Sequence, residues 1–283
     1  MKRLNIILSC GLLALAGSAV AAGDKDATAH RHKARAASHS GKGAVAPHAP
    51  VRLSAEEIVH RNVKARGGEG AWQKVETLTL SGKLEAGGKQ NTELPYVMKM
   101  KRPEKSRLEL VFQNQTAVQT WDGEKGWKTR PFLGRSDAEP FTPAEARAAS
   151  DWQPLDGPLI DHERKGIHVS LVGTDTVEGH PAYELSLTMK DGTERKLWID
   201  ARTFLEAKVE GEPRKLDGRV REVSIFYRDF KTEHGLTTPR LYETVVQGVK
   251  DTHKMQVEKL VVNEAMDDKL FAQPNLSLAR AGK

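Results

Sequence analysis

The sequence predicts a mainly β protein, with a large antiparallel sheet curled into an unclosed barrel and a few short helices forming a lid. Three observations support this fold class. About a dozen segments between residues 77 and 263 alternate apolar and polar side chains, which is typical of strands with one buried face. Short connections rich in Gly, Pro and Asp separate most of them, as expected for antiparallel neighbours. Few helical segments remain to cover the apolar face of so large a sheet.

Residues 1–21 are expected to be a cleaved signal peptide. Lys2 and Arg3 precede an apolar stretch from Leu4 to Ala16, and Ala19-Val20-Ala21 supplies a small-x-small cleavage pattern. The apolar stretch is shorter than the ~20 residues that a membrane-spanning helix needs. Cys10 is the only cysteine and lies inside this stretch, so we reject a lipid-attachment site there. The mature chain is expected in the periplasm, without disulfides or a thiol nucleophile.

Residues 22–50 are expected to form a disordered basic linker rich in Ala, His and Lys. Residues 1–50 contain seven basic and two acidic residues, so residues 51–283 carry only about +1 of the formal net charge of +6. A nucleic-acid-binding domain would carry a basic face on the fold itself, so nucleic acid is excluded as a partner. The linker is either a solvated spacer or a segment that contacts anionic phospholipid or cell wall. Its four histidines are irregularly spaced, so no metal site is predicted there.

One domain is expected over residues 51–275, followed by a flexible tail over residues 276–283. The domain opens with a helix, because Ser54 is a natural N-cap, Glu57 completes a capping box and Gly67-Gly68 ends the pattern. The narrow apolar stripe of this helix consists of Ile58, Val63 and Ala65. The first group of strands is expected over residues 77–85, 94–102, 106–113, 115–121 and 125–130.

Residues 131–166 interrupt the strand pattern. Thr142 is expected to cap a helix with Pro143 at its first position and Glu145 in its first turn, and a second helix is expected from about Pro158 to Lys165. Strands resume over residues 167–173, 181–190, 193–200, 203–210, 219–230, 238–247 and 252–263. A sheet of this size curls, and three short helices cannot cover its whole concave face. The uncovered apolar face therefore predicts a cavity that accepts a ligand.

The sequence carries no catalytic signature. The G-x-S-x-G and H-E-x-x-H motifs are absent. Asp161-His162-Glu163 places three polar residues together, but consecutive side chains on a helix diverge around its axis and do not converge on one metal ion. We therefore predict a protein that is not an enzyme and that has no cofactor and no metal site.

Several short motifs resemble one family. The run from Tyr96 to Arg102-Pro103, followed by Arg107-Leu108-Glu109-Leu110, resembles a strand–R-P–strand element of the LolA/LolB-like periplasmic lipoprotein carriers, a group that includes outer-membrane lipoprotein-sorting proteins. Asp122-Gly123 with Trp127 resembles the D-G-x-x-x-W hairpin of that group. Asp268-Lys269-Leu270-Phe271 with Pro274 is similar to its closing segment. The resemblance covers about residues 51–275, and the chain departs from it in the basic linker and in the long insertion over residues 131–166.

The resemblance implies an unclosed barrel with a helical lid, and a cavity that shields the acyl chains of lipoproteins as they cross the periplasm. In the LolA branch, the arginine of the R-P element ties the lid closed through backbone carbonyls, and Arg102 occupies the matching position here. The alternative for Arg102 is an ordinary surface arginine at a strand end. The implied partners are lipid or lipoprotein acyl chains, together with an inner-membrane delivery complex and an outer-membrane acceptor.

The predicted function is a non-enzymatic carrier that shields the acyl chains of a lipid or lipoprotein for transfer toward the outer membrane. Two other functions stay open: a periplasmic sensing or assembly module that binds a protein partner through the same fold, and a hydrolase with an unrecognised site. Ordinary core packing is the alternative role for each residue of the expected cavity lining. That lining comprises Leu78, Leu80, Tyr96, Met98, Met100, Leu108, Leu110, Phe112, Leu185 and Leu187.

Overall fold

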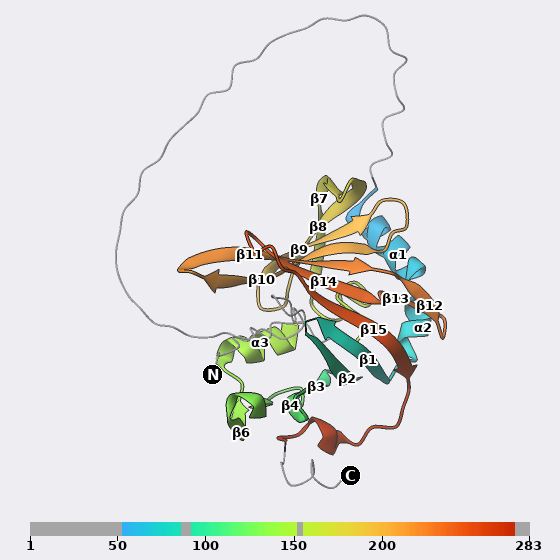
Figure 1. Cartoon of the computed structure of the whole chain (residues 1–283). Helices are drawn as coiled ribbons and strands as arrows, with labels where there is room; N and C mark the ends of the chain where they lie inside the picture. Colours follow the sequence, from blue (N-terminus) through green and yellow to red (C-terminus); the bar gives the residue numbers. More distant parts are fainter. Residues whose placement is uncertain (1–52, 86–91, 152–154, 275–283) are drawn as a thin grey trace, which may run out of the picture.

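The computed structural model describes residues 53–85, 92–151 and 155–274, and it contains one large antiparallel sheet (Figure 1). The expected signal peptide, linker and C-terminal tail lie outside these residues. The thirteen strands of the sheet are β1 (Thr77–Glu85), β2 (Glu93–Lys101), β3 (Lys105–Phe112), β4 (Gln115–Trp121), β5 (Gly126–Arg130), β6 (Arg135–Pro140), β7 (His168–Val177), β8 (His180–Thr188), β9 (Glu194–Asp200), β10 (Glu206–Leu216), β11 (Arg219–Arg228), β14 (Leu241–Val246) and β15 (His253–Val262). A separate two-stranded ribbon pairs β12 (Lys231–Glu233) with β13 (Leu236–Thr238).

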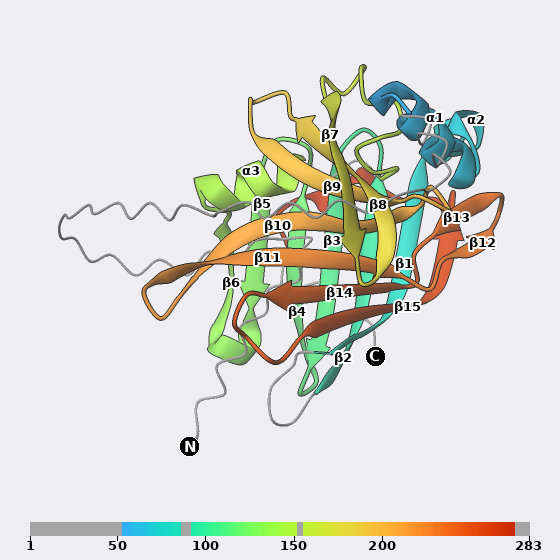
Figure 2. The same ribbon diagram turned by 90° about the horizontal axis from the view of Figure 1, so that it is seen from above.

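The first and last strands of the sheet, β1 and β15, are neighbours at its middle. The strand order is β6-β5-β4-β3-β2-β1-β15-β14-β11-β10-β9-β8-β7. The first half runs outward from β1 to the edge strand β6, and the chain then crosses to the opposite edge strand β7 and runs inward to β15. The two edge strands do not pair with each other, so the sheet is not closed into a barrel. Figure 2 shows the strands of the two halves crossing as the sheet curls over.

The inner face of the sheet follows the alternation expected from the sequence. On β2, every second residue from Leu94 to Met100 is buried. Leu80 pairs with Met98, and Met98 pairs with Leu108 on the next strand. Directly opposed side chains share a face of the sheet, so these strands build a continuous apolar wall.

Three short α-helices cover part of the concave face of the sheet: α1 (Ala55–Ala65), α2 (Glu69–Gln73) and α3 (Pro143–Asp151). Two 3-10 helices, η1 (Pro131–Leu133) and η2 (Asp268–Phe271), lie elsewhere in the chain. The Ser54 hydroxyl caps α1 by accepting from the Glu57 amide at 3.1 Å, as expected. The buried stripe of α1 is Ile58, Val59 and Asn62, so Ile58 matches the prediction, whereas Val63 and Ala65 are only half-buried.

The second helix of the insertion, expected from Pro158 to Lys165, was wrongly predicted. Residues 155–166 form a series of turns. Asp161 has a φ of 55°, a left-handed conformation that interrupts a right-handed helix. The Lys165 side chain also turns back to donate to the Gly157 carbonyl at 2.7 Å. These turns carry the chain across the open side of the sheet between α3 and β7.

The core consists of two main clusters of buried side chains. One cluster joins α2, α3 and the 155–160 turns to β1–β4, and includes Trp72, Met98, Leu110 and Ile160. The other places α1 against the strands from β8 to β11, and includes Ile58, Leu185 and Ile199. The helices and turns therefore form a lid over the concave face, with each half of the sheet contributing its own core.

Candidate ligand-binding cavity

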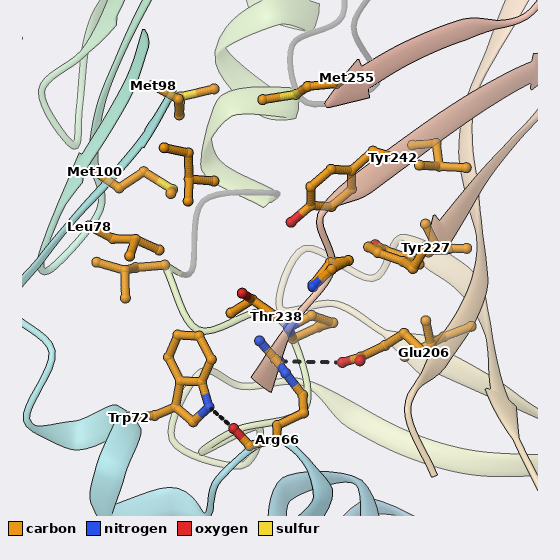
Figure 3. A pocket seen from close by; sticks show the side chains of 18 of the residues that line it. Arg66, Trp72, Leu78, Met98, Met100, Glu206, Tyr227, Thr238, Tyr242 and Met255 are labelled. Carbon is orange, nitrogen blue, oxygen red and sulfur yellow. Dashed lines mark hydrogen bonds and ion pairs between the residues drawn. The ribbon is translucent and has the colours of Figure 1, made fainter. Parts of the chain in front are cut away.

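A cavity of about 140 Å³ lies between the concave face and the lid, and both halves of the sheet contribute to its wall (Figure 3). Its apolar lining includes Trp72 and Leu155 from the lid side. From the sheet it includes Leu78, Leu80, Met98, Met100, Leu187, Leu197, Val209, Ile225 and Met255, and Met189 directly follows β8. The methionines of β2 and β15 and the one after β8 give this wall a pliable surface. The cavity can hold an apolar group.

The volume of the cavity limits the size of the ligand that fits while the lid lies over the sheet. About 140 Å³ is close to the ~150 Å³ of an engineered apolar cavity that takes up benzene. Sites for larger ligands usually measure ~300–1,000 Å³. A long acyl chain therefore fits only if the lid moves away from the sheet.

The structure divides the expected cavity residues into two sets. Leu78, Leu80, Met98, Met100 and Leu187 line the cavity. The other five belong to the core around it: Tyr96, Leu108, Leu110 and Leu185 are buried, and Phe112 is half-buried with its ring 5.9 Å from that of Phe132. All ten point to the concave side of the sheet, but only the first five contact the empty space.

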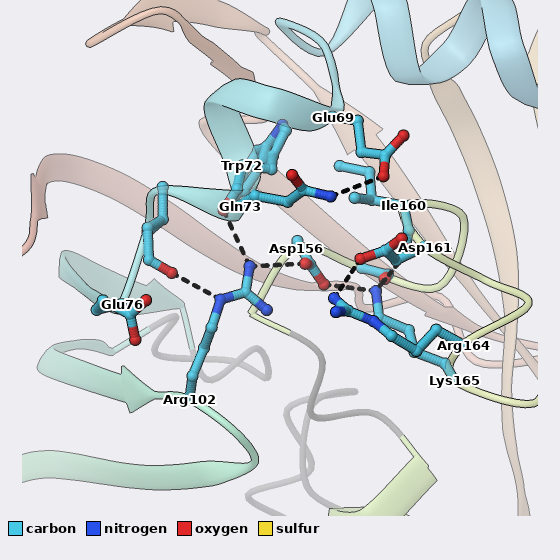
Figure 4. A network of polar contacts seen from close by, with 12 residues as sticks. Glu69, Trp72, Gln73, Glu76, Arg102, Asp156, Ile160, Asp161, Arg164 and Lys165 are labelled. Atoms are coloured by element: carbon cyan, nitrogen blue, oxygen red, sulfur yellow. Dashed lines mark hydrogen bonds and ion pairs between the residues drawn. The ribbon is translucent and has the colours of Figure 1, made fainter.

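Arg102 follows β2 and connects three parts of the structure (Figure 4). Its Nε donates to the Val75 carbonyl at 2.7 Å, and its Nη2 donates to the Trp72 carbonyl at 3.0 Å. The same Nη2 donates to Oδ2 of Asp156 at 2.7 Å. The guanidinium therefore bonds the end of α2, the connection between α2 and β1, and the turns that cross the open side. Its role as a lid latch remains a prediction.

Asp156 is the shared acceptor of this network. Its side chain is 3% exposed, and its Oδ1 accepts from Lys165 Nζ at 2.6 Å. Burial lowers the pKa of the Lys165 amine below its usual value, although the Asp156 carboxylate opposes this shift. One buried carboxylate thus holds two cations from different segments, which fixes the 155–166 turns against α2 and β2.

The cavity also has a polar wall, which the sequence did not predict. Arg66 is the C-cap of α1, and its carbonyl accepts from Trp72 Nε1 and from the Thr237 amide, both at 3.0 Å. The next residue, Gly67, has a φ of 112°, and a Cβ there would lie 2.1 Å from the Gly235 carbonyl oxygen. Only glycine permits this close approach of the β12–β13 turn, which fixes Arg66 at the cavity.

The Arg66 guanidinium lies between an aromatic ring and a carboxylate (Figure 3). Its Cζ is 4.6 Å from the centroid of the Trp72 ring. Its Nη1 donates to the Asp156 carbonyl at 2.7 Å and lies 3.3 Å from Oε1 of Glu206. The side chains of Arg66 and Glu206 are each 8% exposed, so this ion pair is buried at the cavity wall.

Two tyrosines complete the polar wall. The rings of Tyr227 and Tyr242 meet edge to face, with centroids 5.5 Å apart, and both residues line the cavity. Burial raises the pKa of both phenols, and that of Tyr242 to about 12. The arrangement combines an apolar chamber with an arginine, a carboxylate and two neutral phenols. The pair Arg66-Gly67 was visible in the sequence only as the end of a helix.

No metal centre is evident among the described residues, where no group of three or more His, Cys, Asp or Glu side chains is suitably placed. In the trio considered from the sequence, Asp161 pairs with Arg164, and His162 Nδ1 lies 3.0 Å from the Ile167 carbonyl oxygen. These groups make local contacts in the turns. No helix in the described part of the chain is both long enough and apolar enough to span a membrane.

The sequence matches no protein-family model, and no curated protein matches it significantly. Several solved structures are similar in fold, and three of them are described here. A LolA superfamily protein from Nitrosomonas europaea has 16% identity and a TM-score of 0.51, covering 78% of this chain and 99% of its own. A DUF1329 family protein from Desulfovibrio piger has 12% identity and a TM-score of 0.51, covering 77% and 97%. A putative outer membrane lipoprotein-sorting protein domain from Vibrio parahaemolyticus has 12% identity and a TM-score of 0.50, covering 76% and 94%. The resemblance noted in the sequence is thus confirmed at the level of the fold, and the chain has the LolA-like fold.

Proposed function

We propose that this protein is a non-enzymatic carrier that shields an acyl chain of a lipid or lipoprotein in the cavity under its lid. The observation that carries the proposal is the apolar cavity of about 140 Å³ between the concave face and the lid. Leu78, Met98, Met100 and Met255 supply a wall without hydrogen-bonding groups beyond the thioether sulfurs. Such a wall suits an apolar chain of variable length.

The lid supplies the reversible step that a carrier needs. Burying each methylene contributes ~0.8 kcal/mol, so a sixteen-carbon chain is stabilised by ~12 kcal/mol when it is fully shielded. Release then requires an opposing free energy. Closure of the lid over the empty cavity would provide part of it, because the bonds of Arg102 to Trp72, Val75 and Asp156 form again once the chain has left, and transfer to an acceptor would provide the rest.

The route of transfer is part of the proposal. The expected signal peptide supports export to the periplasm, where an inner-membrane complex would deliver the acylated cargo and an outer-membrane acceptor would receive it. The similarity in fold to a structure described as a lipoprotein-sorting domain supports the same route.

Native mass spectrometry of the protein purified without detergent from the envelope fraction tests the proposal. We expect a bound species whose mass corresponds to an acylated molecule and which organic extraction removes. The extracted protein should then take up a fatty acyl ligand at one site. A protein that carries no acyl ligand and takes up none after extraction would refute the carrier function.

A further inference from the structure

The charged groups at the cavity favour a negatively charged ligand group. Arg66 and Arg195 line the cavity together with a single carboxylate, Glu206. Arg195 pairs with Glu212, whose side chain is 47% exposed and does not line the cavity. A half-exposed carboxylate is screened by water, whereas charges at a cavity wall are screened much less. Two guanidinium groups and one carboxylate therefore line the cavity itself, although each arginine is paired with a carboxylate.

The Arg66 side chain also has a donor that is not used in the contacts described. Its Nη1 makes both of its polar contacts, with the Asp156 carbonyl and with Glu206. Its Nε has no hydrogen-bond partner among the described residues, and neither does the buried hydroxyl of Thr238, which lines the same end of the cavity. Buried donors without acceptors are destabilising, so an acceptor group from a ligand would improve this end of the site.

The polar and apolar groups occupy opposite ends of the cavity. Figure 3 shows Arg66 and Glu206 at one end and Met98 and Met255 at the other. We propose that the ligand is an amphiphile with an oxyanion headgroup, a carboxylate or a phosphate, which Arg66 binds while the tail contacts the methionines. This inference rests on the proposed carrier function and narrows its substrate class.

A cationic headgroup is the competing occupant. Glu206 with the rings of Tyr227 and Tyr242 provides a carboxylate and two aromatic faces, which are the groups that bind ammonium ions. Arg66 already lies 3.3 Å from Glu206 and compensates its charge. An added cation would have to displace the guanidinium, whereas an added anion can accept from the Arg66 Nε–H and the Thr238 hydroxyl, which have no partner among the described residues.

Four ligands that share a ten-carbon tail and differ in headgroup test the inference on the purified, lipid-extracted protein. The probes are decanoate, decyl phosphate, 1-decanol and decyltrimethylammonium, each titrated calorimetrically at pH 7.5, the three charged probes below their critical micelle concentrations and 1-decanol below its solubility limit. We expect decanoate or decyl phosphate to bind at least about tenfold more tightly than decanol, the effect of one charge-assisted hydrogen bond. Comparing the affinities of decanoate and decyl phosphate then shows whether the site prefers a carboxylate or a phosphate headgroup.

Substitution of Arg66 and substitution of Glu206 should change the anion-to-alcohol affinity ratio in opposite directions. Arg66→Gln should bring the anion-to-alcohol affinity ratio close to one. Glu206→Gln should raise the ratio, because it removes the carboxylate that competes for Arg66. The double variant should again give a ratio close to one, and it keeps the test available if Arg66→Gln alone does not fold with an unpaired Glu206. Arg61→Gln removes an exposed cation from the same helix and should leave the ratio unchanged.

Different results would contradict the headgroup assignment and the carrier function. Equal binding of all four probes, or tightest binding of decyltrimethylammonium, would overturn the headgroup assignment while the carrier function stands. An anion preference that survives in the folded double variant would place the anion away from Arg66 and would also overturn it. Binding of none of the probes would count against the carrier function itself.

Discussion

The Arg102 guanidinium and the Asp156 carboxylate pair at 2.7 Å and join two segments that are 54 residues apart in the sequence. Asp156 also accepts from Lys165, and its own backbone carbonyl accepts from Arg66. The same residue therefore connects the contacts that hold the lid with the polar end of the cavity. Movement of the 155–166 turns would change both together.

Replacing Arg102 should loosen the lid. Arg102→Gln removes the ion pair with Asp156 and weakens two hydrogen bonds to carbonyls. We expect a loss of about 2–4 kcal/mol in the free energy of unfolding and faster amide hydrogen exchange over residues 155–166. Lys99→Gln on the outer face of β2, the strand that Arg102 follows, is the matched control. Equal exchange rates in the two variants would show that Arg102 does not hold the turns.

The helix α3 is attached to the sheet by a buried ion pair. Lys128 Nζ bonds both carboxylate oxygens of Glu145, with 2.6 Å to Oε2, and the side chains are 6% and 3% exposed. Glu145→Gln should cost about 3–5 kcal/mol in urea unfolding, because it leaves the lysine charge unpaired. Adding Lys128→Met removes that charge and should recover most of the loss. Additive losses in the double variant would contradict this account.

Filling the cavity should abolish binding without unfolding the protein. Leu78→Trp places a larger apolar side chain in the empty space, so its stability should stay within about 1.5 kcal/mol of wild type. Acyl-ligand affinity should fall at least about tenfold. Leu110→Met changes a core residue that does not line the cavity and should leave affinity unchanged. Full affinity in a folded Leu78→Trp protein would place the ligand elsewhere.

The phenols of Tyr227 and Tyr242 at the cavity should ionise at a higher pH than a free phenol. Burial raises the pKa of Tyr242 to about 12 and that of Tyr227 further still, against ~10 for a free phenol. The stability that the neutral phenols contribute is complete below pH ~10 and is lost as the pH rises through the folded-state values. Ultraviolet titration should show late ionisation that coincides with unfolding, and Tyr242→Phe should remove one group from it. Ionisation of both phenols near pH 10 in the folded protein would show that water fills the cavity.

The strands could be predicted from the sequence because their burial pattern is local. The range expected for the first strand, 77–85, is that of β1, and β2 and β3 each differ from their expected ranges by one residue at each end. On β1 and β2 the alternation identified Leu78, Leu80, Met98 and Met100, which line the cavity. Strand β6 was not predicted, since none of its residues is buried and its sequence has no apolar alternation.

The remaining parts depend on contacts between distant residues. The helix expected over residues 158–165 is replaced by turns, because Asp161 adopts a left-handed conformation and Lys165 bonds Asp156 and Gly157. Leu108 and Leu110 share the inner face with Met98 but are buried in the first core cluster and do not line the cavity. Alternation identifies a face, and it does not show which part of that face remains uncovered. Arg66 became a site residue only through Glu206, a partner far along the chain.

A crystal structure of the extracted protein with hexadecanoate would show whether an acyl chain occupies the cavity. We expect continuous ligand density from the methionines of the apolar end, Met98 and Met255, towards Arg66, with the 155–166 turns displaced from Arg102. Density for hexadecanoate on the outer face, with the side chains around the cavity and the Arg102–Asp156 pair unchanged, would contradict it.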